Sequence, residues 1–134
     1  MGVSRWRGED CLDASQTNPD AMVDRLVEYA SSGTLGLLVY EKFQLYVDKA
    51  GQQLGSEFLT PQMIGAMRHI CRRANVPTAC YLASHHKTWA KRDLPTSVMP
   101  LRAWHSYGGG PHAKDSETLG RYHVHRVKNL GKGY

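Results

Sequence analysis

Two acidic residues and a histidine carry the clearest candidate chemistry in this sequence. Glu41 lies within the apolar run LLVYEKFQLY, residues 37–46, where an ionised carboxylate is costly to bury unless it faces a cation, a metal ion or water. His112 and Asp115 are three residues apart, so in a helix their side chains leave from one face. If the three side chains converge, they form a ligand set for Mg²⁺ or Mn²⁺, which can activate water for phosphodiester cleavage. An ion pair from Glu41 to Lys42 or a nearby arginine, or exposure at the strand end, is the alternative.

The elements that must position these residues alternate between strand and helix patterns. A hairpin is expected first, then helices that begin at Asn-Pro and Thr-Pro and end near a glycine or proline. The predicted order is strand, strand, helix, strand, helix, strand, helix, over residues 3–7, 11–15, 18–33, 35–43, 60–77, 78–83 and 112–128. Residues 45–59 and 84–111 are predicted to be irregular. This alternation predicts an α/β fold with a partly parallel sheet, in a single domain over residues 1–134.

Two of these elements are predicted to form the core. The run Leu37 to Tyr40 is continuously apolar, which is typical of a central strand covered on both faces. In the helix that follows Thr60, a buried stripe is expected on one face, with arginines largely outside it. The stripe comprises Met63, Ile64, Met67, Ile70 and Cys71.

Composition excludes several other classes of protein. The chain has 134 residues, of which 22% are charged and 41% hydrophobic, as in ordinary globular proteins. It contains no apolar stretch near the roughly 18 residues that cross a bilayer, and no signal segment at its start, so no membrane association is expected. Cys11, Cys71 and Cys80 are odd in number and form no C-x-x-C pair, which argues against a disulfide framework or zinc ribbon. A reducing, cytoplasmic setting is therefore expected.

The charges are divided unevenly along the sequence. Residues 1–60 hold five Lys/Arg and nine Asp/Glu, a net −4, whereas residues 61–134 hold twelve and three, a net +9. A basic half predicts a polyanionic partner, most commonly nucleic acid, although a solvated basic surface is the alternative. The candidate contacts to nucleic acid are Arg68, Arg72, Arg73, Lys87, Trp89, Lys91, Arg92 and Lys114.

Three residues near these candidates have competing interpretations. Trp89 lies between Lys87 and Lys91, where it could stack on a splayed base or pack against the sheet. His86 is interpreted as a surface or satisfied histidine, because no metal-ligand spacing accompanies it. Glu117 is interpreted as an acidic residue that stabilises the first turn of the last helix through the helix dipole.

Two stretches of this sequence carry a family resemblance. VYEKFQLYVDKAGQQLGSEFLTPQMIGAMRHI and the later GGPHAKDSETLGRYHVH resemble the bacteriophage-encoded RuvC-like resolvases of the ribonuclease H-like superfamily. The resemblance covers about residues 2–128 and implies a five-stranded mixed sheet flanked by helices. It further implies metal-dependent cleavage of branched DNA, typically the Holliday junction, by a homodimer in the host cytoplasm. Glu41 matches the family's strand-end glutamate, and His112 and Asp115 match its last-helix pair.

The beginning of the chain departs from this family. Family members open with a strand that ends in an Asp-Pro-Gly type motif, whose Asp ligates metal, whereas this chain begins MGVSRW and Gly2-Val3 aligns just after that Asp. In the family the first strand lies centrally, between the strand expected at residues 3–7 and the one bearing Glu41, so its absence would expose strand edges.

Three explanations of this departure remain open. The sequence could start at an internal methionine. Alternatively, the chain could be a shortened, non-catalytic module that binds nucleic acid or protein. Finally, Asp10, Asp13 or Asp48 could replace the missing carboxylate, although for surface aspartates solvation in a turn or loop is the better interpretation.

Overall fold

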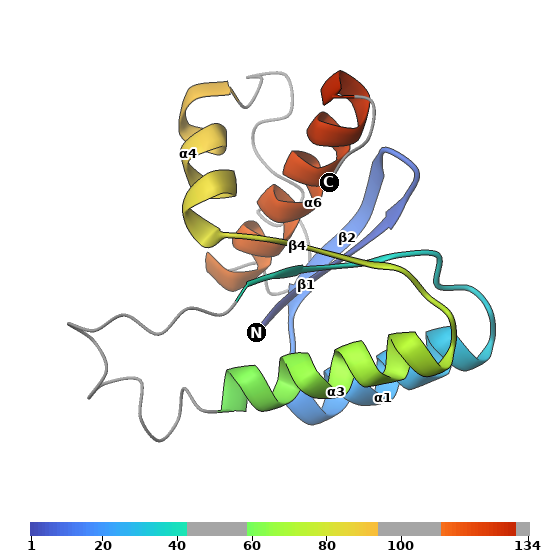
Figure 1. Cartoon of the computed structure of the whole chain (residues 1–134). Helices are drawn as coiled ribbons and strands as arrows, with labels where there is room; N and C mark the ends of the chain where they lie inside the picture. The colour runs from blue at the N-terminus through green and yellow to red at the C-terminus, as the bar shows by residue number, and fades with distance from the viewer. Residues whose placement is uncertain (43–58, 94–110, 131–134) are drawn as a thin grey trace. The chain divides into compact units, whose positions relative to one another are not determined.

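The structure, a computed structural model, describes residues 1–42, 59–93 and 111–130. Within these ranges the strands are β1 (Gly2–Arg7), β2 (Asp10–Gln16), β3 (Leu38–Glu41) and β4 (Thr78–Tyr81). The helices are α1 (Pro19–Ser31), α3 (Leu59–Arg73), α4 (Ala83–Asp93) and α6 (Pro111–Leu130). The predicted α/β class and the predicted order of elements are confirmed, with α4 as an addition (Figure 1).

The chain divides into two compact units, and each is described by itself. Unit 1 comprises Met1–Asn18 and Tyr81–Tyr134, and unit 2 comprises Pro19–Cys80. The predicted single domain over residues 1–134 stays a prediction. No described helix is long and apolar enough to span a membrane.

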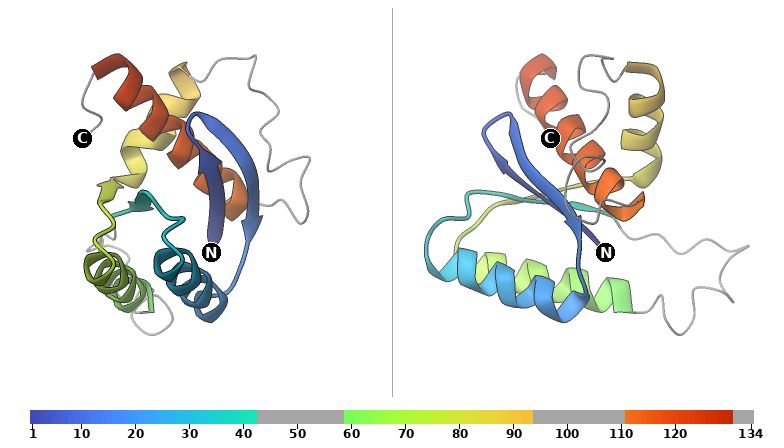
Figure 2. Two further views of the ribbon diagram at one scale, coloured as in Figure 1. Left: turned by 90° about the vertical axis from the view of Figure 1, so that its right-hand side faces the viewer. Right: turned by 180° about the vertical axis from the view of Figure 1, so that it is seen from behind.

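Unit 1 consists of a β-hairpin covered by a long helix. Strands β1 and β2 pair antiparallel from Gly2 opposite Gln16 to Arg7 opposite Asp10, with an irregular register after Arg5. The turn includes Gly8 at φ +61°, a left-handed conformation that glycine adopts without strain. Helix α6 packs on both strands, and α4 packs on α6 (Figures 1 and 2).

Residues 84–111 are predicted to be irregular. Helix α4 shows that this prediction is wrong for residues 84–93. Residues 83–93 contain no proline or glycine, and the helix buries His86 and Trp89, which are three residues apart. Trp89 packs against Tyr122 of α6, with 5.7 Å between ring centroids. The polar composition hides this two-residue stripe, which is too short to reveal a helix by periodicity alone. The remainder of the predicted irregular segment, residues 94–110, lies outside the described residues.

Unit 2 packs α1 against α3 around an apolar core (Figure 2). Leu26 of α1 is buried together with Met63, Met67 and Cys71 of α3, and Ile64 and Ile70 pack partly buried against them. The predicted stripe of α3 is therefore confirmed. Sequence periodicity succeeds here because every third or fourth residue of this helix is apolar.

Both helices of unit 2 end in the same hydrogen-bonded motif. At the end of α1, Gly33 (φ +74°) donates to Ala30 O and Thr34 N donates to Tyr29 O, 3.1 Å. At the end of α3, Asn75 (φ 58°) donates to Arg72 O and Val76 donates to Cys71 O, 2.8 Å. This pattern is the Schellman motif, in which a residue in the left-handed conformation closes the last turn.

Strand β3 is shorter and less buried than the sequence predicts. It spans Leu38–Glu41 instead of residues 35–43, its first three residues are half-buried and Glu41 is exposed. The reason lies in the strand pairing. The described strands pair only as β1–β2 and β3–β4, so β3 is not the central strand that its apolar sequence suggests. Leu38 N donates to Pro77 O, 3.1 Å, so β3 and β4 start side by side, which indicates a parallel pair connected through α3.

Candidate functional site

The first two turns of α6 hold two of the three predicted metal ligands. Pro111 occupies the start of the helix, where its fixed φ suits the first turn and no N–H is needed. The backbone N–H of His112 donates to Gln16 Oε1 of β2, 3.3 Å. His112 is exposed and Asp115 half-buried, and their three-residue spacing in the helix puts both side chains on one face, as predicted.

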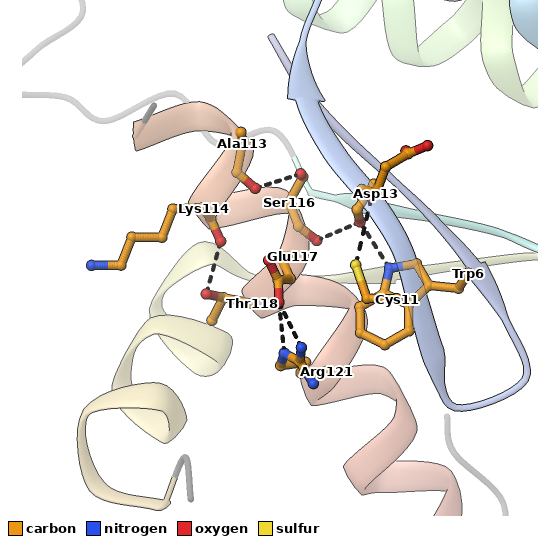
Figure 3. Close-up of polar contacts among 10 residues, drawn as sticks. Trp6, Cys11, Asp13, Ala113, Lys114, Ser116, Glu117, Thr118 and Arg121 are labelled. Atoms are coloured by element: carbon orange, nitrogen blue, oxygen red, sulfur yellow. Dashed lines mark hydrogen bonds and ion pairs between the residues drawn. The ribbon is translucent and has the colours of Figure 1, made fainter. Parts of the chain in front are cut away.

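The hairpin holds this part of α6 through its backbone. A Cβ added at Gly2 would collide with the carbonyl of His112, so only glycine fits at this point of β1. One residue pair further along, Ser4 Oγ donates to Ser116 O, 2.9 Å, and accepts from Trp6 Nε1, 2.9 Å (Figure 3). These contacts fix the backbone that carries His112 and Asp115 relative to β1.

A buried ion pair lies further along α6. The Glu117 side chain is fully buried, and its Oε2 accepts from Arg121 Nε at 3.0 Å and Nη2 at 2.6 Å (Figure 3). The Arg121 guanidinium also lies 5.4 Å from the centre of the Trp6 ring. The interpretation of Glu117 as a residue that stabilises the first turn through the helix dipole is therefore wrong, because Glu117 lies beyond that turn and pairs with Arg121. The Glu-to-Arg spacing of four residues is the sequence signal that could have revealed the pair.

Asp115 has a cationic neighbour in α4. Lys87 Nζ lies 3.7 Å from Asp115 Oδ2, and both side chains are about half exposed. Exposed pairs of this kind contribute at most about 1 kcal/mol, so an incoming cation could displace the lysine. Lys87, predicted as a phosphate contact, thus lies beside the predicted metal ligand. The carboxylate of Asp115 remains accessible.

Glu41 is the last residue of β3, in unit 2, whereas His112 and Asp115 belong to unit 1. The strand predicted over residues 35–43 thus ends at Glu41. Across residues 1–42, 59–93 and 111–130 no group of three His, Cys, Asp or Glu side chains is arranged to hold a metal ion. The carboxylate and imidazole chemistry of Glu41, Asp115 and His112 suits Mg²⁺ or Mn²⁺, and their assembly into one site stays a prediction.

The alternative carboxylates have different surroundings. Asp13 pairs with Arg5 across the hairpin and also accepts from Arg5 Nε at 2.8 Å, so it has a structural partner. Asp10 is exposed at the start of β2. Asp48 lies outside the described residues, as do the predicted loop at residues 45–58 and the glycines before Pro111.

The predicted nucleic-acid contacts fall into two groups. Six of them are exposed on helix surfaces. Lys91 and Arg92 lie in the last turn of α4, and the three arginines of α3 project outside its buried stripe. The six exposed residues are Arg68, Arg72, Arg73, Lys87, Lys91 and Arg92. Lys114 in α6 is half-buried. Trp89 is only 8% exposed and its ring lies 5.2 Å from that of His125. A base cannot reach a buried indole face, so packing is the correct interpretation for Trp89. The indole packs against α6 instead of the sheet.

A cluster of aromatic and basic side chains was not predicted from the sequence. Tyr81 Oη lies 2.8 Å from His123 Nδ1, and the Tyr81 and Tyr122 rings meet edge to face at 5.1 Å. Burial lowers the pKa of His123 below its ordinary value, which favours the neutral imidazole near neutral pH. Arg126 lies over both tyrosine rings. The cluster joins the end of β4 to α6.

Comparison with known proteins adds no relative to this description. No protein-family model and no curated protein matches the sequence.

Proposed function

We propose that this chain is a Mg²⁺- or Mn²⁺-dependent endonuclease of the RuvC-like resolvase type, with a ribonuclease H-like fold, that cuts branched DNA such as the Holliday junction. The observation that carries the proposal is the placement of three residues at the ends of elements. Glu41 ends β3, and His112 and Asp115 lie in the first two turns of α6. These are the positions at which the resemblance puts metal-binding side chains.

The strand pairing supports the same proposal. The resemblance implies that a further strand lies between β1 and β3. Among the described strands, β1 pairs with β2 and β3 pairs with β4, which are the two pairs left when that strand is removed from the sheet.

Each candidate residue has a role in this proposal. Glu41 and Asp115 would hold the divalent ion, with His112 as a further ligand or as the acid that protonates the leaving oxygen. When bound, the ion would supply an activated water and charge stabilisation for the phosphodiester. Lys87, next to Asp115, would neutralise the phosphate at the cleavage point.

The biological setting follows from the resemblance. The protein would act as a homodimer on the two-fold geometry of a four-way junction, in the cytoplasm of the host cell if a phage encodes it.

A second candidate is a non-catalytic module of the same fold that binds nucleic acid or protein. The Lys87–Asp115 ion pair favours it, because a lysine beside the carboxylate provides charge neutralisation that a catalytic site would obtain from metal. This module needs the basic surface and not the carboxylates.

The experiment is cleavage of a labelled four-way DNA junction by the 134-residue chain with Mg²⁺ or Mn²⁺. Glu41→Gln and Asp115→Asn should each lower the cleavage rate by more than about 100-fold. Loss of a residue that only hydrogen-bonds to a metal ligand already costs up to about 100-fold, and these two residues would bind the metal directly. Glu28→Gln, an exposed carboxylate of α1, is the matched control and should cut normally. Cleavage that survives both substitutions would refute this metal site.

Binding without cleavage would lead to a complementation test. The chain is extended at its N-terminus by one apolar strand that ends in Asp-Pro-Gly, and a second version ends in Asn-Pro-Gly. Cleavage by the Asp version alone would support a nuclease that needs the additional carboxylate. Inactivity of both versions, with junction binding intact, would favour the non-catalytic module.

A further inference from the structure

Two exposed arginines of unit 2 line a small pocket next to the start of β4. Arg68 and Arg72, four residues apart on α3, line this pocket together with Val76 and Thr78. Its volume is about 200 Å³, below the roughly 300–1,000 Å³ of sites that enclose a drug-sized ligand. A pocket of this size suits a single small group.

The charge of the pocket is not balanced by acidic neighbours. Among the described residues no carboxylate pairs with Arg68 or Arg72, and residues 59–80 contain no Asp or Glu. Tyr40 is close enough to Arg68 for the cation to lower its pKa, but burial outweighs that effect and raises the pKa overall. Tyr40 is therefore a neutral phenol near neutral pH, and it leaves the Arg68 charge uncompensated.

The helix dipole opposes an anion here, but only weakly. The pocket lies at the C-terminal end of α3, which carries about half a negative charge. The Schellman motif occupies the carbonyls of Cys71 and Arg72 with the amides of Val76 and Asn75, which reduces the exposed negative potential. Two full positive charges outweigh the remaining partial charge.

We infer that Arg68, Arg72 and Thr78 together hold one phosphodiester group of a nucleic-acid backbone. Two planar guanidinium groups offer paired N–H donors that match the oxygens of a phosphate, and the threonine hydroxyl adds a third donor. Because the arginines are exposed, the pocket is accessible to a phosphate on the surface of a polymer. The inference rests on the nucleic-acid binding that both candidate functions share. It assigns the phosphate to Arg68 and Arg72 and not to Arg73, which does not line the pocket.

The inference predicts a distinctive salt dependence. The logarithm of a DNA-binding constant falls with the logarithm of salt concentration by about 0.9 for each neutralised phosphate. If both arginines hold the same phosphate, Arg68→Gln or Arg72→Gln alone should change the slope little, because the remaining arginine still neutralises that phosphate, and the double variant should lower its magnitude by about 0.9. Two separate phosphates would instead give a decrease of about 1.8 in the double variant.

The test measures the fluorescence anisotropy of a labelled four-way DNA junction against salt concentration, in EDTA so that cleavage cannot occur. Thr78→Val should weaken binding with little change of slope, because it removes a donor without removing charge. Arg25→Gln, which removes an exposed arginine of the same unit outside the pocket, should leave the slope unchanged. Circular dichroism of each variant checks that the fold is intact.

Several results would overturn the inference. These are an unchanged slope in the double variant, a decrease of about 1.8, an equal decrease with Arg25→Gln, or no junction binding by the unmodified chain. Titration with inorganic phosphate, followed by the NMR signals of the arginine side chains, distinguishes the source of the anion. Phosphate binding without junction binding would identify a site for a free anion and overturn the assignment to nucleic acid.

Failure of the proposed endonuclease is a separate outcome. If cleavage is absent while the predicted slopes are observed, the phosphate pocket is supported and the proposed nuclease is refuted. If cleavage is present while the slope of the double variant matches that of the unmodified chain, the nuclease is supported and the phosphate pocket is refuted.

Discussion

Removal of the Glu117 carboxylate should destabilise unit 1 more than any surface charge substitution. The Glu117 side chain has no exposed area, and the Arg121 side chain is 19% exposed. Loss of one partner from a buried ion pair costs about 3–5 kcal/mol, because the other charge is left without compensation. The partial exposure of Arg121 allows it some contact with water, so we expect the lower end, about 3 kcal/mol, for Glu117→Gln.

Urea denaturation measures this difference. With a typical dependence of about 2 kcal/mol per molar urea, the midpoint should fall by about 1.5 M. All three tryptophans lie in the residue ranges of unit 1, so tryptophan fluorescence reports on the unit that contains the pair. Asp13→Asn removes the partner of the exposed Arg5 and is the matched control, which should cost less than about 1 kcal/mol.

A double substitution separates charge from packing. Glu117→Leu with Arg121→Met replaces both charges by apolar side chains of similar size, and such exchanges are often neutral or stabilising. We therefore expect the double variant to be more stable than Glu117→Gln. A midpoint for Glu117→Gln within about 0.3 M of the unmodified protein, roughly 0.6 kcal/mol, would refute this interpretation of the pair. So would a double variant as unstable as the single one.

Three further predictions concern glycine packing, histidine ionisation and a helix end. Gly120→Ala should lower the free energy of unfolding in urea by about 1–3 kcal/mol, because the added Cβ would overlap the Trp6 ring. Gly65→Ala, in open space on α3, should instead raise the free energy of unfolding by up to about 1 kcal/mol. Because the pKa of His123 is lowered in the folded chain, the unfolded chain binds a proton at this histidine more readily than the folded chain does. The stability that this group contributes is therefore complete above about pH 6.5 and is lost as the pH falls below it. His123→Gln should therefore flatten the stability profile in thermal unfolding between about pH 5 and 7. Asn75→Gly should raise the melting temperature and Asn75→Ala should lower it, because the residue has φ 58°.

Each of these predictions has its own control. Gly65→Ala serves for Gly120→Ala, and equal destabilisation by both would contradict the overlap with Trp6. His69→Gln alters an exposed histidine of α3 and should leave the pH profile unchanged. If His69→Gln flattens the profile as much as His123→Gln, burial of His123 is not the cause. For Asn75, a higher melting temperature with alanine would argue against the left-handed conformation.

The parts of the fold that sequence reasoning predicts are those specified locally. The hairpin, the start of α1 at Asn18-Pro19 and the apolar stripe of α3 each follow from residues adjacent in sequence or one helical turn apart. The extent of β3 depends instead on which strands lie beside it. Its apolar residues suggest a central position, but their burial is set by pairing partners that its own residues do not specify.

The candidate site divides in the same way. The position of His112 and Asp115 near the start of α6 follows from the turn signals before the helix, so the sequence predicts it correctly, whereas β3 ends at Glu41, two residues before the predicted strand end. The roles of Trp89 and Glu117 could not be predicted, because each depends on contacts between distant segments. Trp89 is buried by α6, and Glu117 lies where α6 meets Trp6 of the hairpin. Polar or amphipathic side chains inside such contacts resemble surface residues when only the sequence is read.

The division of unit 1 between the two ends of the sequence affects how the chain folds during synthesis. Its hairpin leaves the ribosome before unit 2, whereas α6, which covers the hairpin, is made after unit 2. Unit 2 is continuous from Pro19 to Cys80, so it can fold while unit 1 is incomplete. During that interval the hairpin face on which Ala113 will pack against Ala14 is exposed, and it is open to chaperones or to association with other nascent chains. The waiting time is set by translation of the more than 90 residues between β2 and α6.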